Sequence, residues 1–175
     1  MKKVKEIIFS ILISIIFLSG SASAQLAEQK KISIDQIVSN TKKNLSSTKK
    51  RFVLKSKVKG GGYVSEKFSY VMHEKIVKAL RVVIQDGTVT SEQEFYYSEG
   101  NLIYATESET AVKDGEIIHE WSGIYYFDGG DLFDYSTNGH GKSEDDNWQP
   151  EKEIPQLSRK RLKQLSKLLK NKEQL

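Results

Sequence analysis

The feature that most constrains the fold is a run of short alternating segments between residues 51 and 136. Apolar and polar side chains alternate there with a period of two, the spacing typical of β-strands with one buried face. Turn sequences such as Asp86-Gly87 and Gly60-Gly61-Gly62 separate the segments, with no helical pattern between them. Parallel strands would need long connections, so neighbouring segments should pair antiparallel. We predict an α+β domain with a curved antiparallel β-meander of six to eight strands, in which the apolar segment 75–85 is the central strand.

Two amphipathic helices are expected to flank this sheet. At the N-terminal side, Ser33 and Gln36 form a capping box, and an apolar stripe continues to Leu45. At the C-terminal side, a helix from about Pro155 to Asn171 carries leucines on one side and basic residues around the rest. Both helices should pack on the sheet.

The N-terminus has the pattern of a secretory signal peptide. Three lysines in the first five residues precede an apolar run over residues 7–18, and Ala22-Ser23-Ala24 fits the A-x-A cleavage pattern. A retained membrane anchor is the alternative, but the apolar run is short for a span of about 20 residues. We therefore expect an exported protein, periplasmic or secreted, with no transmembrane segment after cleavage. The predicted division is a cleaved signal peptide at 1–24, a flexible lead at 25–32 and a single α+β domain at 33–175.

Composition removes several classes of function. The chain contains no cysteine, which excludes disulfides, thiol catalysis and Cys-based zinc or iron–sulfur sites. After cleavage, 24 Lys and Arg would face 22 Asp and Glu, so the net charge gives no argument for nucleic-acid binding. The charge is unevenly placed: residues 25–85 carry 14 basic and 4 acidic residues, residues 86–150 carry 2 and 15, and residues 151–175 carry 8 and 3. The chain thus runs basic, acidic, basic.

Two hairpin signals lie in the acidic middle of the chain. Tyr96-Tyr97 and Tyr125-Tyr126, 29 residues apart, each run into an acidic glycine turn and a Leu-led strand. Because side chains alternate along a strand, each pair should place one ring on each face, and a face without a helix would expose tyrosines among carboxylates. Cross-strand packing is the simpler role for these rings. The candidate partner-binding residues are Tyr96, Tyr97, Trp121, Tyr125, Tyr126 and His119.

The hairpin strings FYYSEGNLIYA and IYYFDGGDLF resemble those of small uncharacterised exported proteins of Bacteroidota-type bacteria. That resemblance implies an antiparallel sheet and no activity. The order of a helix followed by a meander also looks like the half-barrels of periplasmic lipoprotein carriers, whose cavity holds acyl chains.

Metal and catalytic sites have weaker signals. His140 lies in a glycine-rich loop near Asp145 and Asp146, but the acids lack the spacing of a calcium loop, and a solvated turn explains them equally well. Gly141-Lys142-Ser143 ends like a phosphate-binding loop without its first glycine, because the required position is Ser136. No cofactor motif is present, and neither a triad nor a carboxylate pair can be assembled from sequence.

Three hypotheses remain, in order of preference. The first is a non-catalytic exported binding or interaction protein of the bacterial envelope that uses an aromatic and acidic sheet face toward a cationic protein or peptide. The second is a periplasmic carrier that holds an apolar or lipid ligand in a half-barrel cavity. The third is a hydrolase with a site near His119 or His140.

Overall fold

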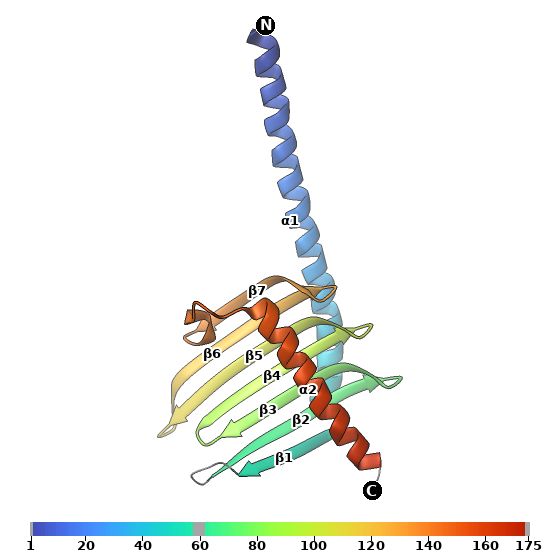
Figure 1. The fold of residues 1–175 in the computed structure, drawn as a ribbon, viewed down its shortest axis with the longest axis vertical. Helices are drawn as coiled ribbons and strands as arrows, with labels where there is room; N and C mark the ends of the chain where they lie inside the picture. Colours follow the sequence, from blue (N-terminus) through green and yellow to red (C-terminus); the bar gives the residue numbers. More distant parts are fainter. Residues whose placement is uncertain (1, 58–61, 174–175) are drawn as a thin grey trace. The chain divides into compact units, whose positions relative to one another are not determined.

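The structure, a computed structural model, describes residues 2–57 and 62–173 of the 175-residue chain. The predicted Gly60-Gly61-Gly62 turn therefore lies largely outside the described residues. The elements, drawn in Figure 1, are α1 (Lys2–Ser47), β1 (Arg51–Lys57), β2 (Tyr63–His73), β3 (Ile76–Asp86), β4 (Val89–Ser98), β5 (Asn101–Lys113), β6 (Glu116–Asp128), β7 (Asp131–Gly139), the short 3₁₀ helix η1 (Lys142–Glu144) and α2 (Pro150–Glu173).

The chain divides into two compact units, residues 1–36 and 37–175, and the boundary falls inside α1. In the first unit the helix begins far upstream of Ser33, so the prediction that Ser33 caps its N-terminus is wrong. Residues 25–32, expected to be a flexible lead, are helical as well. The physical reason is local propensity: Leu, Ala, Glu, Gln and Lys dominate residues 25–31 and are all good helix formers.

In the second unit, seven strands form one open antiparallel sheet in the order β1-β2-β3-β4-β5-β6-β7. This confirms the predicted curved meander. The prediction of the central strand is wrong, because β4 and not β3 lies in the middle. Four successive residues of β4, from Glu94 to Tyr97, are buried, since helices cover this strand on both faces. Because β4 contains acidic residues as well as aromatic ones, a prediction based on hydrophobicity did not identify it as the central strand.

The two tyrosine hairpins are confirmed as hairpins, with a corrected alignment. A β-bulge falls between Tyr96 and Tyr97 in the first and between Tyr126 and Phe127 in the second. The turns that follow, Glu99-Gly100 and Gly129-Gly130, have positive φ at both residues, the conformation of a two-residue hairpin turn that favours glycine. The structurally equivalent pairs are thus Tyr96-Tyr97 and Tyr126-Phe127, one residue away from the pairing that the sequence indicated.

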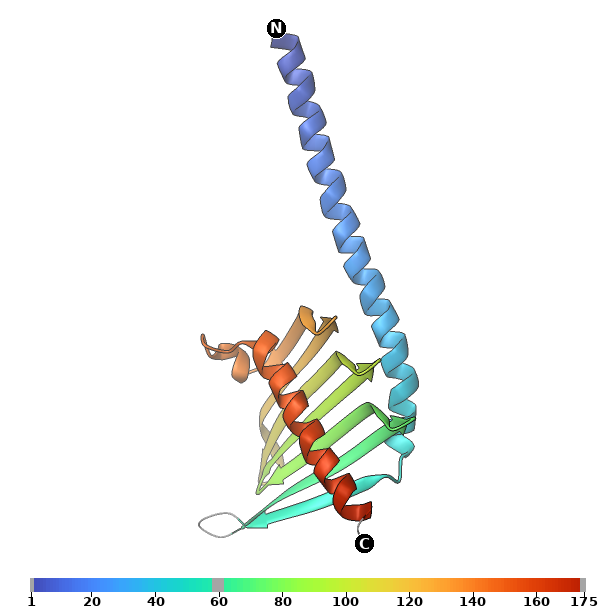
Figure 2. The same cartoon turned by 45° about the vertical axis from the view of Figure 1, so that its right-hand side comes forward.

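Helix α2 crosses one face of the sheet, whereas residues 37–47 of α1 lie on the other (Figure 2). On the α1 side, the Lys42 ammonium lies 3.7 Å from a carboxylate oxygen of Glu94. On the α2 side, one row of paired residues crosses five strands and forms the centre of the core. That row consists of Tyr70, Leu80, Phe95, Ala105 and Tyr125. Ile154 and Leu165 of α2 pack against this core and are at most 1% exposed.

Helix α2 begins at Pro150, five residues before the predicted start. Gln149 precedes the first turn, and its backbone N–H donates to the Glu153 carboxylate (3.4 Å), which satisfies one donor at the start of the helix. Pro150 occupies the first helical position, where a missing N–H has no cost. Pro155 consequently lies inside the helix, where it was expected to begin it.

Candidate functional site

The α2 side of the sheet is apolar at one end of the strands and polar at the other. Two rows of paired residues next to the core row carry the polar side chains: Gln93 lies beside Glu107, and Ser91 beside Glu109 and Trp121. Strand alternation places all of these on one face. The polar side chains from β4, β5 and β6 on this face are Ser91, Gln93, Glu107, Glu109, His119 and Trp121.

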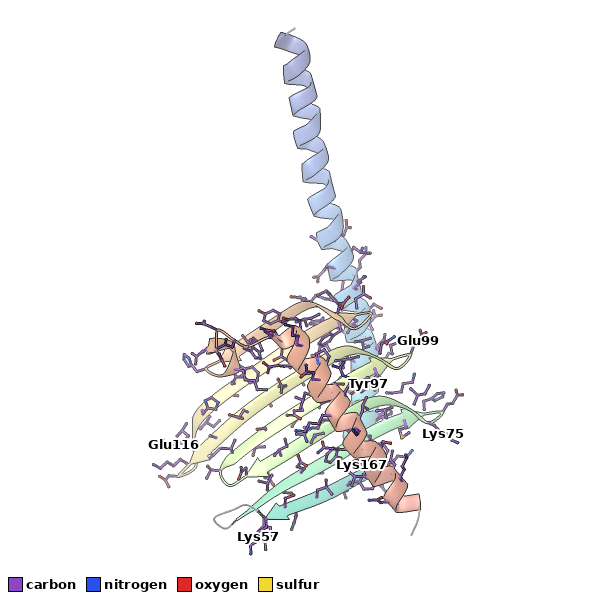
Figure 3. The ribbon with its side chains drawn as sticks, in the orientation of Figure 1. Lys57, Lys75, Tyr97, Glu99, Glu116 and Lys167 are labelled. Atoms are coloured by element: carbon purple, nitrogen blue, oxygen red, sulfur yellow. The ribbon has the colours of Figure 1, made fainter. Side chains whose placement is uncertain are left out.

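These six side chains line a small pocket with a volume of about 80 Å³. Glu92 and Ser108 also line it, and a further wall comes from the segment between β7 and α2, residues 140–149, which we call the strap. Gly141 and Lys142 of the strap lie directly on the pocket. Helix α2 crosses the sheet beside this region, with Tyr97 beneath it and Glu116 at the distant tip of the β5–β6 hairpin (Figure 3).

Glu107 is a carboxylate buried at the floor of the pocket, only 4% exposed. The ammonium of Lys142 lies 2.9 Å and 3.1 Å from its two oxygens and donates to both. The Tyr125 hydroxyl donates to Glu107 over 3.5 Å. Burial, and after it the neighbouring Glu107 charge, raises the pKa of Tyr125 above its usual value. The Tyr125 hydroxyl is therefore a protonated donor at neutral pH.

Trp121 forms the aromatic wall of the pocket and is covered by the strap. The Lys142 ammonium lies 5.6 Å from the centre of its ring, within the range of a cation–π contact. Its indole N–H donates to the Ser143 hydroxyl over 3.4 Å. A Cβ atom on Gly141 would lie 2.6 Å from the ring, so only glycine lets the strap approach this closely.

Glu109 connects the remaining polar groups. Its carboxylate accepts a hydrogen bond from the Ser91 hydroxyl (3.2 Å) and lies 3.4 Å from Nε2 of His119. The carboxylate thus stands between the hydroxyl and the imidazole. In a nucleophile–base–acid arrangement the imidazole would take that middle place, so these contacts do not prepare Ser91 for nucleophilic attack.

Most of the candidate aromatic residues are buried in packing. Tyr96, Tyr97, Trp121 and Tyr125 are 0–4% exposed, whereas Tyr126 and His119 are half-buried. The condition for exposed tyrosines, a face without a helix, is not met because each face carries one. The pocket brings together Trp121 and His119, with Tyr125 contacting Glu107 from the core, while Tyr97 lies under α2 with its hydroxyl 2.8 Å from that of Ser158.

Tyr96 belongs to the opposite face. Its hydroxyl donates to the buried Glu94 carboxylate (2.8 Å), which also lies 3.5 Å from Nε of Arg81. Burial, and after it the Glu94 charge, raises the pKa of Tyr96. The rings of Tyr104 and Tyr126 continue from Tyr96 in edge-to-face contacts, with centroids 5.7 Å and 5.1 Å apart. The three rings thus pack against one another across β4, β5 and β6.

Two of the three weak metal candidates, His140 and Asp145, have protein partners. The His140 imidazole contacts the Glu144 carboxylate, and this hydrogen bond raises the pKa of His140. A carboxylate oxygen of Asp145 accepts from the backbone and side-chain amides of Asn147. Within residues 2–57 and 62–173, no group of three or more potential ligands is close enough to hold a metal ion.

Sequence reasoning missed the three residues that organise this face: Glu107, Lys142 and Arg161. Lys142 is one of two basic residues between positions 86 and 150, so a search for internal counter-charges in the acidic segment would have found it. Arg161 is 5% exposed although it lies in a run of basic residues that reads as a solvated helix face.

Comparisons with protein-family models, curated proteins and solved structures found no match for this chain. In the part of the chain that the structure describes, no helix is both long and apolar enough to cross a membrane.

Proposed function

We propose that the protein is a non-catalytic binding protein that accepts a cationic group of a protein or peptide partner in the pocket on β4, β5 and β6. The observation that carries this proposal is the buried Glu107 carboxylate beside the Trp121 ring at the floor of a solvent-facing pocket. A carboxylate and an aromatic face together are the chemistry that recognises an ammonium group. Glu109, half exposed at 47%, adds a second negative charge at the entrance.

The packing between α2 and the sheet favours this function over a lipid carrier. The large apolar side chains that would have to line an acyl cavity contact one another there, and Phe68, Leu80, Phe95 and Phe127 are at most 1% exposed. An acyl chain could enter only by displacing them, at the cost of their packing.

The first test is a calorimetric titration with the peptide acetyl-Gly-Lys-Gly-amide at low salt. We expect Glu109→Gln to weaken binding about 5–10-fold, equivalent to about 1.0–1.4 kcal/mol, because the pocket loses one charge at its entrance. Affinity should also fall as salt is raised, since a half-exposed carboxylate is screened.

The matched control is Glu116→Gln, which removes an exposed carboxylate at the tip of the same hairpin, outside the pocket. It should leave the affinity unchanged. Equal binding of acetyl-Gly-Glu-Gly-amide would show that charge does not select the ligand and would refute the proposed function.

We further propose that the protein is exported to the bacterial envelope, on the strength of the signal-peptide pattern in residues 1–24. Cleavage after Ala24 would leave residues 25–47 of α1 attached to the sheet unit. Intact-mass analysis of protein from the periplasmic fraction should give a chain that begins at Gln25. A chain that keeps residues 1–24 would count against export by cleavage.

A further inference from the structure

The pocket already contains a cation of the kind that the proposed ligand would supply. The Lys142 ammonium contacts both oxygens of Glu107 and lies over the Trp121 ring. A single nitrogen makes both carboxylate contacts, so the geometry suits a compact primary ammonium. The space left beside it, about 80 Å³, has room for only a few further atoms.

The strap that carries Lys142 is weakly held along most of its length. Apart from Gly141 and Trp148, all of its residues are exposed, and the 3₁₀ turn that contains Lys142 buries no residue. Its main anchor is the Trp148 ring, which lies edge-on to Trp121, Tyr125 and Tyr135. The Trp148 indole N–H is buried with no hydrogen-bond partner among the described residues, which makes the closed strap less stable.

Glu107 prevents the strap from simply opening. The Glu107 carboxylate is 4% exposed with the strap closed, and the sheet still shields it from below when Lys142 leaves, so loss of this counter-charge carries a free-energy penalty. A second ammonium in the place of Lys142 removes that penalty, because one cation replaces another at the same oxygens. Opening of the strap and entry of a ligand are therefore coupled through Glu107.

We infer that Lys142 is an internal occupant of a site for a primary ammonium group, and that the strap is a lid that opens when the lysine side chain of a peptide partner replaces it. This inference rests on the proposed function and adds its ligand class and its regulation. The ligand lysine would contact Glu107 and Trp121, while Glu109, Ser91 and His119 line the path of the chain that carries it.

The test uses the whole protein, with n-butylammonium as the probe and sodium chloride at matched ionic strength as the reference. Lys142→Met removes the occupant and keeps the length of the side chain. We expect this variant to bind n-butylammonium at least about 10-fold more tightly than the wild type by calorimetry, because the probe no longer competes with an internal amine. The double variant Lys142→Met with Glu107→Gln should lose that gain. Lys160→Met, an exposed lysine of α2, is the matched control and should bind as the wild type does.

A second variant leaves Lys142 in place. Gly141→Ala adds a Cβ that would overlap the Trp121 ring, so it should loosen the strap and tighten binding of the probe about 3–10-fold. If Lys142→Met does not fold, Gly141→Ala is the variant that tests the lid. Guanidinium and tetramethylammonium serve as further probes, and tighter binding of either than of n-butylammonium would overturn the ligand class.

The outcomes separate this inference from the proposed function. If the wild type binds the lysine peptide but neither variant binds n-butylammonium more tightly than the wild type, the pocket is a binding site and the lid is refuted. If neither the wild type nor the variants bind any ammonium, both are refuted.

Discussion

Raising the pH from 10 to 12 is expected to unfold the protein cooperatively. Burial raises the pKa of Tyr96, Tyr97 and Tyr125 in the folded state, whereas an unfolded tyrosine ionises near pH 10. The unfolded chain therefore loses these protons first, so their contribution to stability is complete below about pH 10 and is lost as the pH rises. Each phenol that stays protonated lowers the free energy of unfolding by up to about 1.4 kcal/mol per pH unit. Because a typical domain is stable by only about 5–15 kcal/mol, three such groups acting together are expected to remove enough stability to unfold the protein.

The measurement is absorbance of tyrosinate at about 295 nm together with near-ultraviolet circular dichroism, and the two transitions should coincide.

The substitution Tyr97→Phe should change the free energy of unfolding in opposite directions at neutral and at high pH. At pH 7 it should lower the free energy of unfolding by about 1 kcal/mol, because the hydrogen bond with Ser158 is lost. Near pH 12 it should stabilise by about 1–2 kcal/mol, since one buried phenol no longer opposes ionisation. Tyr63→Phe, at an exposed ring, should change neither value. Loss of stability by Tyr97→Phe at both pH values would contradict this account.

Arg161→Met is expected to be the most destabilising change on α2 outside the apolar core. The guanidinium is 5% exposed and donates to Glu66 (2.8 Å), Gln93 (2.9 Å) and Gln164 (2.9 Å), joining the helix to β2 and β4. Methionine has a similar volume but leaves the acceptors of Glu66 and Gln93 without this donor. Because Glu66 is 23% exposed and can be partly solvated, we expect a loss of about 2–4 kcal/mol, below the full cost of breaking a buried pair. The melting temperature should fall by about 5–15 °C.

Arg159→Met is the control for helix propensity and for net charge. Arg159 lies two residues away on the exposed side of α2, so its replacement should change stability by no more than about 0.5 kcal/mol. Urea unfolding at pH 7 measures both variants. Equal effects of the two substitutions would show that the contacts of Arg161 with the sheet do not stabilise the fold.

The strands and turns were predictable because the information for them is local. Period-two alternation identified β2, and the turn sequence Asp86-Gly87 located the β3–β4 hairpin within a residue or two. The helix ends were harder to predict from the sequence. Helix α1 continues through a good capping sequence at Ser33, and α2 begins at Pro150, which lies before the stripe of leucines. Caps compete with the helix propensity of their neighbours, and sequence alone does not rank the two.

The pocket was predictable only in part. Trp121 and His119 were singled out because they share a strand face, which alternation determines. Glu107 and Lys142 are 35 residues apart and meet only because the strap returns over β5 after two further strands. Their pairing depends on tertiary structure, and the same holds for Arg161 and Glu66, 95 residues apart.

Consecutive pairing of all seven strands also bears on the order of folding. Each hairpin closes a short loop, so the sheet can grow from any turn at a small entropic cost and without waiting for distant segments. Helix α2 follows all seven strands in the chain, yet it covers Leu80, Phe95 and Tyr125 of the strands before it. Until α2 docks, a nascent sheet would present that apolar face to solvent, and so the C-terminal helix governs how long the folding chain remains prone to aggregation.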